Sequence, residues 1–425
     1  MTSAQSLPAP RELRPYQVEA LAKDEAARLR GARTVCLVAP TGSGKTTTAV
    51  EWAMRQRAPA GIGVWVAHRQ ELLEQAMNAM LFGGPRVRFC MVQGGHIPIG
   101  ADWYVLDECH HLYGTEQWSP AIAPARTGPT LALTATPERG DGAALGNLAD
   151  ALVTAAQPRE LIAAGFLVPC DVIAPAGPTR AMSEHPVKAY QQHAPGQKAI
   201  VFCRDVKHAQ QVADDFRDAG IPAGCVDGKM PEELRAARLA AHRSGELLIL
   251  TNVQLLTEGY DDPSVSCAII CTGVSTPGAW IQRIGRIVRP YPGKLRAVVI
   301  DLRGSVYLHG MPDEDRSYSL EGKAISTGGD VTEAIRQCRS CQRVFRAVEY
   351  HDATCPSCGA RSKGKPDPRI RREQIQKVLA THTVAEKKRT YQALVATAAA
   401  RGYSPKWPAV QYKIRYRHWP GAEVR

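Results

Sequence analysis

The sequence predicts an α/β protein with two domains, each built on a parallel sheet with helices on both faces. Short apolar runs recur along the chain, each followed by turn residues and a segment with helical periodicity. The chain has 425 residues, which is more than one core of ordinary size accommodates. Its composition, with 44% hydrophobic, 22% charged and 6% aromatic residues, is typical of a globular α/β protein.

The expected strands fall into two groups. Apolar runs that are long enough for a strand but too short for a helix predict fully buried strands. The first group is TVCLVAP (34–40), GVWVAH (63–68), YVLD (104–107) and TLALTAT (130–136). The second group is KAIVFC (198–203), LLILT (247–251), CAIICTG (267–273) and AVVIDL (297–302). Because the strands alternate with helical segments, each group predicts a parallel sheet.

A Pro- and Ala-rich stretch, QPRELIAAGFLVPCDVIAPAGP (157–178), separates the two groups and predicts a domain boundary near residues 165–180. The later segment MPDEDRSYSLEG (311–322) is expected to be a solvated loop. The expected domains are residues 1–170, residues 171–325, a small unit over residues 330–362 and a tail over residues 363–425.

The excess positive charge lies almost entirely at the C-terminal end of the chain. The net charge is +12, from 53 Lys and Arg and 41 Asp and Glu residues. Residues 363–425 contain 15 Lys and Arg against four Asp and Glu, a local charge of +11. A local excess of this kind predicts binding to a polyanion such as nucleic acid. A tail that only improves solubility is the alternative.

The sequence shows no targeting or membrane signal. No apolar run approaches the roughly 18 residues that a membrane span needs, and the N-terminal MTSAQSLPAPREL has no apolar signal core. Eight of the 12 cysteines stand singly in apolar stretches, which fits buried free thiols in a reducing compartment. We therefore expect a cytoplasmic protein, of a prokaryote or a phage-infected host cell, without membrane contact.

The segment LVAPTGSGKTTT (37–48) places a turn of small residues between a buried strand and a helix. The backbone N–H groups of such a turn lie at the start of a helix, where the dipole favours anions, so the turn is suited to hold phosphates. The segment departs from G-x-x-x-x-G-K-[ST] only at its first position, Ala39. Lys45 is expected to reach the β and γ phosphates and Thr46 to ligate Mg²⁺. The other residues expected to contact the nucleotide here are Thr41, Gly42, Ser43, Gly44 and Thr47.

The stretch VLDECHHLYG carries five consecutive side chains that can bind a metal, Asp107 to His111. An Asp at the C-terminal end of a neighbouring parallel strand lies where a Mg²⁺ ligand is needed beside a phosphate-binding turn, which assigns Asp107. Glu108 can then polarise a water for attack on the γ-phosphate as a general base. A zinc site is disfavoured, because three successive strand side chains cannot converge on one tetrahedral ion.

These residues resemble the motifs of superfamily 2 helicases and translocases of the DEAD/DEAH-box (DExH) kind. The resemblance covers roughly residues 11–305, and the motifs appear in the family's order. APTGSGKT (39–46) resembles motif I and DECH (107–110) resembles motif II. The resemblance implies two RecA-like P-loop NTPase domains.

Three further motifs of the first domain carry implied roles. ELRPYQ resembles the motif on the adenine side, which implies that Arg14 and Gln17 lie near the base. VWVAHRQELLEQ (64–75) resembles motif Ia, which touches the nucleic-acid backbone in the family. LTATPER resembles motif III, which implies coupling roles for Thr134 and Thr136.

The second domain supplies motifs IV and V. IVFCRDVKHAQ (200–210) resembles motif IV. TNVQLLTEGYDDP resembles motif V, with Thr257, Gly259 and Asp261 at the matching places. The resemblance implies that Gly259 and Asp261 belong to the nucleotide site.

QRIGRIVRP resembles motif VI and follows motif V. The resemblance implies that Arg286 and Arg289 are arginine fingers, which neutralise charge developing on the γ-phosphate. In relatives the fourth residue of motif II contacts the Gln of motif VI. His110 and Gln282 are therefore expected to couple the two domains.

The resemblance implies that the two domains close on ATP and Mg²⁺ and reopen after hydrolysis. Each cycle would then move the strand contacts of one domain relative to those of the other, which is directional stepping along a nucleic-acid strand. We expect an ATP-dependent DNA helicase or translocase, with proteins of replication, repair or recombination as further partners. Three alternatives stay open. They are an RNA helicase, a motor that remodels or anneals DNA without unwinding it, and a regulatory nucleic-acid-binding protein with a vestigial ATPase.

Four cysteines are spaced in pairs near the C-terminal end. Cys338-x2-Cys341 is followed after thirteen residues by Cys355-x2-Cys358. Four thiolates at this spacing predict a closed tetrahedral zinc ribbon, without a catalytic role because no ligand position is open. The ribbon is too small for a core of its own, so the metal would hold it folded. Free or disulfide-linked cysteines are the alternative.

The tail combines two expected helices with a basic, aromatic ending. The helices are RIRREQIQKVLA (369–380) and AEKKRTYQALVATAAARG (385–402). The aromatic residues, interleaved with basic ones, are Tyr403, Trp407, Tyr412, Tyr416 and Trp419. They predict a surface that stacks on bases while neighbouring cations neutralise phosphates, or alternatively a small aromatic core. A zinc ribbon with such an ending also resembles the accessory region of phage-encoded helicases.

Overall fold

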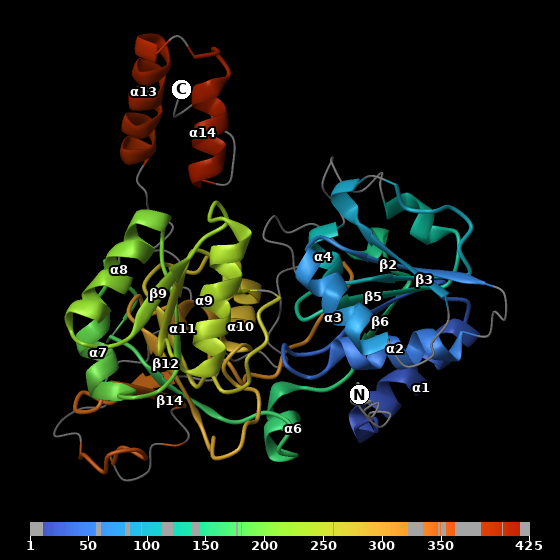
Figure 1. Ribbon diagram of the computed structural model, residues 1–425, viewed down its shortest axis with the longest axis horizontal. Helices are drawn as coiled ribbons and strands as arrows, with labels where there is room; N and C mark the ends of the chain where they lie inside the picture. The colour runs from blue at the N-terminus through green and yellow to red at the C-terminus, as the bar shows by residue number, and fades with distance from the viewer. Residues whose placement is uncertain are drawn as a thin grey trace, which may run out of the picture. The chain divides into compact units, whose positions relative to one another are not determined.

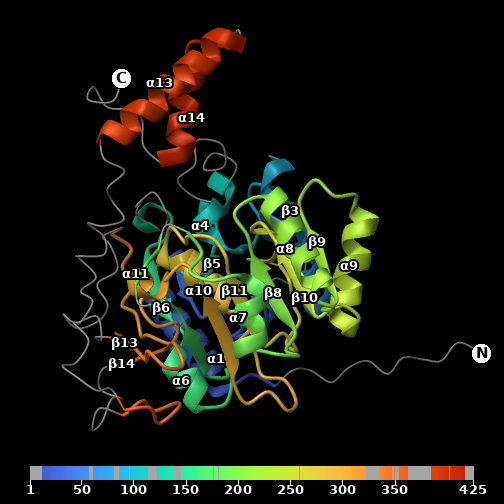
Figure 2. The ribbon, with the colours of Figure 1, turned by 90° about the vertical axis from the view of Figure 1, so that its left-hand side faces the viewer.

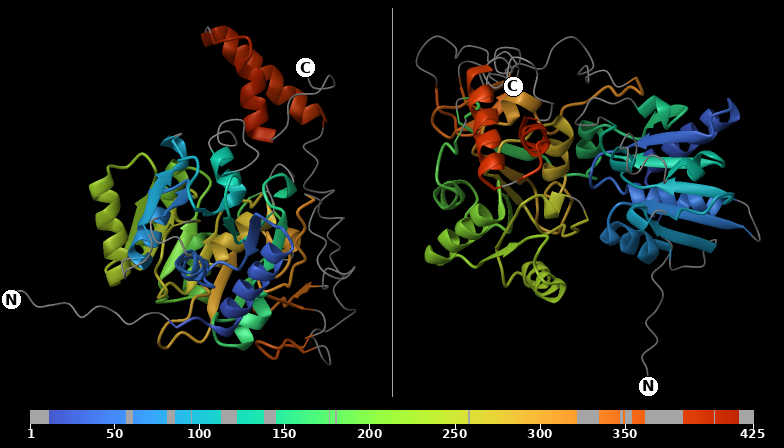
Figure 3. Two further views of the ribbon diagram at one scale, coloured as in Figure 1. Left: turned by 90° about the vertical axis from the view of Figure 1, so that its right-hand side faces the viewer. Right: turned by 90° about the horizontal axis from the view of Figure 1, so that it is seen from above.

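The computed structural model divides into two compact units, Met1–Asp367 and Pro368–Arg425 (Figure 1). The first unit contains two sheets, and we call the parts of the chain around them the first lobe and the second lobe. Figures 2 and 3 show the ribbon from two sides and from above. The structure describes residues 12–56, 61–80, 86–94, 96–112, 122–137, 145–175, 177–179, 181–257, 259–321, 335–346, 349, 354–361, 384–401 and 403–416.

The first lobe has a six-stranded sheet of order β3-β2-β4-β5-β1-β6. All its strand pairs are parallel. The strands are β1 (Thr34–Val38), β2 (Ile62–Ala67), β3 (Arg86–Met91), β4 (Trp103–Leu106), β5 (Thr130–Thr134) and β6 (Ala151–Thr154). The helices are α1 (Pro15–Leu29), α2 (Lys45–Arg55), α3 (Gln70–Met80), α4 (Cys109–Leu112) and, between the lobes in sequence, α6 (Pro158–Ala163). The four predicted strands of the first group are confirmed.

The second lobe has an eight-stranded sheet of order β13-β14-β7-β12-β11-β8-β10-β9. The strands from β7 to β9 in this order pair in parallel. They are β7 (Cys170–Ile173), β8 (Ala199–Phe202), β9 (Ala223–Val226), β10 (Ile249–Asn252), β11 (Cys267–Ile270) and β12 (Ala297–Asp301). The helices are α7 (Pro186–His193), α8 (Val206–Asp218), α9 (Glu232–Ser244), α10 (Pro277–Ile284) and α11 (Val306–His309). The four predicted strands of the second group are confirmed.

Local sequence sets where the helices that matter for the site begin. α10 starts at Pro277, and the Oγ1 atom of Thr276 accepts a hydrogen bond from the backbone N–H of Ala279 at 3.2 Å. Such a cap satisfies one of the free N–H groups of a first helical turn. α2 starts directly after Gly44, whose φ of +80° is accessible to glycine at little cost.

The hairpin that carries the first cysteine pair is attached to the second-lobe sheet. β13 (Ile335–Gln337) and β14 (Arg343–Arg346) form a hairpin around the first cysteine pair, and β14 pairs antiparallel with β7 at the edge of the second-lobe sheet. The backbone N–H of Ala174 donates to the carbonyl of Gln342, which continues this edge pairing. The hairpin therefore extends the sheet of the second lobe. The domain boundaries proposed from the sequence stay predictions.

The expectation of a solvated loop over residues 311–322 is wrong for the described part. We call residues 310–321 the strap. Its Glu314 and Arg316 side chains are buried, and its Tyr318 and Leu320 pack against the hydrophobic core of the first lobe. The charged residues of this segment favour exposure to solvent. Tyr318 and Leu320 nevertheless pack on the first lobe, which keeps the segment against the protein.

The second unit is a helical hairpin of α13 (Val384–Arg401) and α14 (Trp407–Tyr416), which confirms the second expected tail helix. The expected helix over residues 369–380 lies outside the described residues. None of the helices that the structure describes combines the length and the hydrophobicity needed to cross a membrane.

Candidate functional site

The phosphate-binding turn has the backbone that its glycines predict. Gly42 and Gly44 have φ values of +88° and +80°, and the turn leads directly into α2 at Lys45. The Nζ atom of Lys45 donates to the carbonyl of Ala39 at 3.3 Å. Burial lowers the pKa of Lys45, while the neighbouring Glu108 and Asp107 carboxylates oppose that shift. Thr46 and Thr47 follow in the first turn of α2.

The start of α1 packs onto this turn. The hydroxyl of Tyr16 donates to the carbonyl of Ser43, and the Nε2 atom of Gln17 donates to the carbonyl of Gly44 at 3.2 Å. Gln17 is buried, and its amide approaches Gly44 so closely that a Cβ at that position would lie 2.9 Å from Nε2. Gln17 therefore holds the shape of the turn.

Arg14 lies beside an aromatic residue that the sequence did not single out. Its guanidinium stands over the ring of Phe166 at 4.6 Å, and the Tyr16 ring lies 5.5 Å from that of Phe166. Phe166 comes from the segment that connects the lobes, where nothing in the sequence marks it as part of a site. The group offers flat surfaces beside the turn, of a kind suited to a nucleobase.

Asp107 and Glu108 follow β4, whose neighbour β5 separates it from β1 and the phosphate-binding turn. Only 3% of Asp107 and 5% of Glu108 are exposed. Burial, and then the charge of Glu108, raises the pKa of Asp107 to about 7, while Lys45 opposes the shift. A cation close to these carboxylates would stabilise the ionised form.

Glu108 has a strained backbone. Its φ of +48° lies in the left-handed region, which a residue with a long side chain rarely adopts. Its backbone N–H donates to Oδ1 of Asp107 at 3.0 Å, so the turn is stabilised locally. Strain of this kind is concentrated at functional sites, because the surrounding structure has to maintain it.

His110 connects the two lobes. Its Nδ1 lies 2.9 Å from Oγ1 of Thr134 in the first lobe, and its Nε2 lies 3.2 Å from Nε2 of Gln282 in α10. Oγ1 of Thr134 also accepts from the backbone N–H of Thr136 at 3.0 Å. Four predicted coupling residues therefore form one continuous group of contacts.

The segment from α10 to Arg289 packs on the first lobe without room for larger residues. A Cβ at Gly285 would lie 2.3 Å from Cβ of Thr41, and one at Gly278 would lie 2.9 Å from Oγ1 of Thr136. The phosphate-binding turn thus contacts the backbone of Gly285, and motif III contacts the backbone of Gly278, both in the second lobe. Replacing either glycine would force the two surfaces apart.

The two candidate arginine fingers differ in what holds them. Arg286 is 6% exposed, and its guanidinium donates to the carbonyls of Thr257 at 2.8 Å and Tyr260 at 3.1 Å. Arg289 forms an ion pair with Asp261, and its Cγ lies 3.0 Å from the position of a Cβ at Gly42. Arg289 therefore lies directly against the phosphate-binding turn.

Motif V is held from the first lobe as well. The Nη1 atom of Arg69 donates to the carbonyl of Leu255 at 3.1 Å, and Nε2 of Gln75 donates to the carbonyl of Gly259 at 2.6 Å. Arg69 precedes α3 and Gln75 lies in it, within motif Ia. The sequence indicated this segment but not these contacts, because their acceptors are backbone atoms.

Two buried hydroxyl groups of the phosphate-binding turn indicate that it can bind a nucleotide. Oγ1 of Thr41 and Oγ of Ser43 are buried and have no hydrogen-bond partner within the described part of the chain. Buried hydroxyls without partners are costly and rare in native proteins. Phosphate oxygens at this turn would supply the acceptors that they lack, and Thr46 and Asp107 are the residues that would ligate Mg²⁺.

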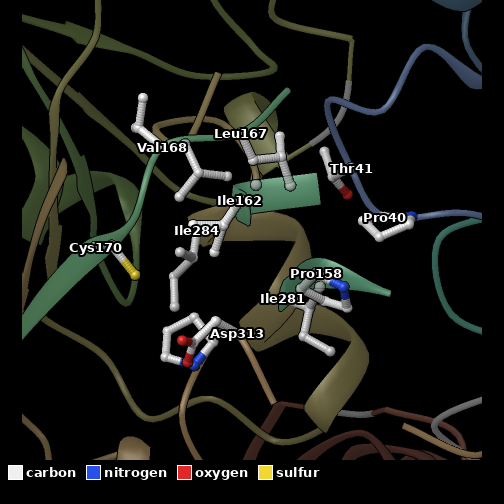
Figure 4. A pocket seen from close by; sticks show the side chains of 13 residues that line it. Pro40, Thr41, Pro158, Ile162, Leu167, Val168, Cys170, Ile281, Ile284 and Asp313 are labelled. Atoms are coloured by element: carbon white, nitrogen blue, oxygen red, sulfur yellow. The ribbon is translucent and has the colours of Figure 1, made fainter. Parts of the chain in front are cut away.

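A largely apolar pocket opens beside the turn (Figure 4). It is lined from the first lobe by Pro40 and Thr41, and from α10 by Ile281 and Ile284. The strap contributes Pro312 and Asp313, while α6 and the segment after it supply further walls. The pocket therefore lies where four parts of the interlobe contact meet.

The four paired cysteines converge. Their sulfur atoms all lie within 4.8 Å of one another, with 3.7 Å between Cys338 and Cys358 and 3.8 Å between Cys341 and Cys355. Metal–sulfur bonds of about 2.3 Å in a tetrahedron place sulfur atoms roughly 3.8 Å apart. The backbone N–H of Ala360 lowers the pKa of Cys358 to about 7, which favours its thiolate, whereas burial raises the pKa of Cys338 and that of Cys341, so these two thiolates would depend on the charge of the ion.

The tail hairpin uses its aromatic residues in two ways. Tyr412 is fully buried, and its ring meets that of Tyr391 edge-on at 5.7 Å. Tyr403 is exposed, and its ring lies 4.8 Å from that of the half-buried Trp407. The structure does not describe the side chain of Tyr416 or any part of Trp419. The small-core alternative thus holds for Tyr412, while Tyr403 remains accessible and Trp407 partly so.

Two family profiles match the chain. The profile of the helicase conserved C-terminal domain matches residues 182–291, and that of the type III restriction enzyme, res subunit, matches residues 11–86. The matches cover motifs IV to VI and motifs I to Ia, respectively.

Two curated relatives are similar to parts of the chain, and the second carries a helicase name. A 51.5 kDa protein of Lactococcus phage (isolate 7-9) is 31% identical over 41% of this chain and 38% of its own length. A Schizosaccharomyces pombe protein, irc3, named as a mitochondrial ATP-dependent helicase, is 25% identical over 69% of this chain and 58% of its own. The chain thus spans less than two thirds of either relative.

Two solved structures share the fold. One is an ATP-dependent type ISP restriction-modification enzyme, LlaBIII, bound to DNA, with a TM-score of 0.53 and 15% identity over 68% of this chain and 28% of that one. The other is a fragment named as the HsdR subunit of a type I restriction enzyme from Vibrio vulnificus, with a TM-score of 0.56 and 21% identity over 70% of this chain and 65% of that one.

Proposed function

We propose that this chain, which belongs to superfamily 2 of the helicases and translocases, is an ATP-dependent motor that moves along or unwinds DNA. The observation that carries the proposal is the contact of the phosphate-binding turn with the arginine-bearing segment of the second lobe. Arg289 lies against Gly42, and Gln282 reaches His110, which follows the candidate general base. Such an arrangement lets nucleotide binding and lobe closure depend on each other.

Each residue of the site has one role in hydrolysis. The turn and Lys45 bind the phosphates, and Glu108 accepts a proton from the attacking water. Arg289 neutralises charge that develops on the γ-phosphate. Mg²⁺, when held by Thr46 and Asp107, would neutralise charge on the phosphate oxygens. The buried position of Glu108 excludes bulk water, which strengthens these interactions.

Coupling to nucleic acid follows from the motif V loop. Gln75 and Arg69 hold the carbonyls of Gly259 and Leu255, while Arg286 holds those of Thr257 and Tyr260. The motif V loop therefore accepts hydrogen bonds from Arg286 of the second lobe and from the motif Ia segment of the first lobe. A shift of the arginine segment after hydrolysis would reach the candidate nucleic-acid contacts through this loop.

The choice of DNA over RNA rests on the name of one relative, because positive charge attracts the phosphates of either polymer. That relative is the DNA 3'-5' translocase XPB2 of Sulfurisphaera tokodaii, which is 30% identical over 27% of this chain and 25% of its own length. Three other relatives are named as RNA helicases, which keeps an RNA motor as the second candidate. We assign the tail a binding role because of its +11 charge and the accessible pair of Tyr403 and Trp407.

Single-stranded DNA is expected to stimulate the ATPase more strongly than RNA of equal length and sequence. A chain ending at Asp367 is the matched comparison, because it keeps β13 and β14 in the second-lobe sheet. We expect this truncated chain to bind DNA more weakly and to show a flatter dependence of binding on salt, since fewer phosphates are neutralised. Stronger stimulation by RNA would contradict the DNA assignment, and a rate that neither polymer changes would contradict the motor.

We assign one structural zinc ion to the four paired cysteines, on the basis of the sulfur separations. Replacing Cys338 with Ser (Cys338→Ser) is expected to reduce bound zinc from about one ion per chain to a small fraction of that, and to lower the unfolding temperature. Cys90→Ser is the control, because Cys90 lies on β3 in the other lobe. Zinc is measured by elemental analysis. An unchanged zinc content in Cys338→Ser would exclude this site.

A further inference from the structure

The strap connects α10, the helix that precedes Arg286 and Arg289, to the first lobe. Its first residue, Gly310, accepts a hydrogen bond at its carbonyl from Nε1 of Trp280 at 3.1 Å. Trp280 is fully buried and lies in α10, which also carries Gln282 and leads to Arg286 and Arg289. The start of the strap is thus attached to the element that presents the fingers.

The middle of the strap is held by one side chain near the first lobe. Gln157 lies three residues after β6 and precedes α6. Its Nε2 donates to the carbonyl of Arg316 at 2.9 Å, and its Oε1 accepts from the backbone N–H of Arg316 at 3.1 Å. The amide therefore satisfies both backbone groups of one strap residue, which fixes the position and the orientation of that residue.

The end of the strap lies on the first lobe. The carbonyl of Leu320 accepts from the backbone N–H of Gly146 at 2.7 Å, and a Cβ at Gly146 would lie 3.0 Å from that oxygen. Tyr318 and Leu320 pack on the core that includes Leu145. Residues 310–321 thus reach from the second lobe to the first, and Ile335 is again in the second-lobe sheet.

The strap is also fixed from the cysteine hairpin. Arg346 on β14 forms an ion pair with Asp313, and its Nη1 lies 3.3 Å from Oε1 of Glu349. Nη2 of Arg316 also donates to the carbonyl of His309, the last residue of α11 before the strap, at 2.8 Å. Asp313 also lines the pocket that Pro40 and Thr41 line (Figure 4). The strap is therefore a packed element with defined attachments at both ends.

We propose that Gln157 is a positioning residue: through the strap, it limits how far the second lobe can move from the first and so keeps Arg289 within reach of the phosphate-binding turn. A single connecting segment would let the lobes separate widely between cycles. A second attachment restricts them to a narrow range and raises the effective concentration of the fingers at the nucleotide. This proposal rests on the proposed function only for its catalytic consequence.

The interlobe distance distribution tests the proposal directly. Leu29 in α1 and Leu295 before β12 are 84% and 83% exposed, so both accept fluorophores through azide-bearing amino acids without involving the cysteines. In Gln157→Leu, without nucleotide, we expect a broader and longer distribution of energy-transfer distances than in the wild type. Because each of the two lost hydrogen bonds contributes about 1 kcal/mol net, the ratio of open to closed states should rise roughly 30-fold.

Two comparisons separate positioning from general destabilisation. Gln56→Leu is the matched control, because Nε2 of Gln56 donates to the carbonyl of Trp52 at 3.1 Å within the first lobe. It should leave the distance distribution unchanged. Gln157→Glu keeps the acceptor for the N–H of Arg316 but loses the donor, so it should lie between the wild type and Gln157→Leu.

The ATPase supplies the second readout. In Gln157→Leu we expect the DNA-stimulated kcat to fall by up to roughly 30-fold, because the closed fraction cannot fall by a larger factor than the open-to-closed ratio rises, while KM for ATP changes less than about twofold. An unchanged distance distribution in Gln157→Leu would overturn the proposal, whatever the ATPase does. If that variant does not fold, Leu320→Ala at the far end of the strap is judged by the same criterion. The distance measurement stands even if the chain proves not to be a motor.

Discussion

Glu108→Gln is expected to lower kcat for ATP hydrolysis by about 10³-fold, which is within the range for loss of a general base. Gln has nearly the same shape as Glu but cannot accept a proton from water at neutral pH. The position tolerates no larger change, since Glu108 is buried and its φ is +48°. ATP binding should stay within about twofold of the wild type, because the phosphates are held by the turn and by Lys45.

The two effects are measured separately, turnover by phosphate release and binding by equilibrium titration with a fluorescent ATP analogue. Glu51→Gln is the control, because Glu51 lies on α2 beside the same turn but is paired at the surface with Arg55, 2.9 Å away. It should leave both quantities unchanged. Hydrolysis at a normal rate in Glu108→Gln would remove Glu108 from the mechanism.

Arg289→Ala is expected to reduce kcat by about 10³-fold, the lower end of what arginine fingers contribute. Arg289 lies against Gly42 of the turn, whereas the guanidinium of Arg286 is engaged by two carbonyls of motif V. Arg289 is therefore the arginine that can contact the γ-phosphate with the smaller rearrangement, namely release from Asp261. Arg286 mainly connects motif V to α10 in this structure.

ATP affinity should fall much less than kcat in Arg289→Ala, because a finger acts most strongly on charge that develops in the transition state. Arg296→Ala is the matched control, since Arg296 is paired with Asp171 within the second lobe. Single-turnover measurements separate the chemical step from product release. A loss of less than about tenfold would show that Arg289 is not the finger.

The sequence predicted the strands that are apolar throughout. Six strands of the described part were missed, of which β13 and β14 flank the first cysteine pair. β3 alternates exposed and buried residues at a sheet edge, and β6, β7 and β9 are only four residues long, among Ala, Gly and Pro. Short strands at sheet edges are specified by their partners more than by their own composition. β7 lies within the very stretch that indicated a domain boundary.

The sequence also predicted the parts of the site that follow a local pattern. Short motifs specify these parts, because the chemistry at each place requires particular residue types at a fixed spacing. They are the phosphate-binding turn, Asp107, Glu108 and the segment with Arg286 and Arg289. Phe166, Gln157 and the strap could not be found in this way, because their roles depend on contacts between distant segments. Gln157 binds backbone atoms of Arg316, and no residue type at position 316 is needed for that contact.

The antiparallel pairing of β14 with β7 matters for the protein before the proposed zinc ion is bound. Without β14, the N–H and C=O groups along one side of β7 would form an open edge that other chains could join. The cysteine hairpin is synthesised after the other strands of this sheet, so it protects the second lobe against association once it has paired with β7. Scarcity of the metal would then reduce the amount of soluble protein, while each molecule that did fold would retain its phosphate-binding turn in the other lobe.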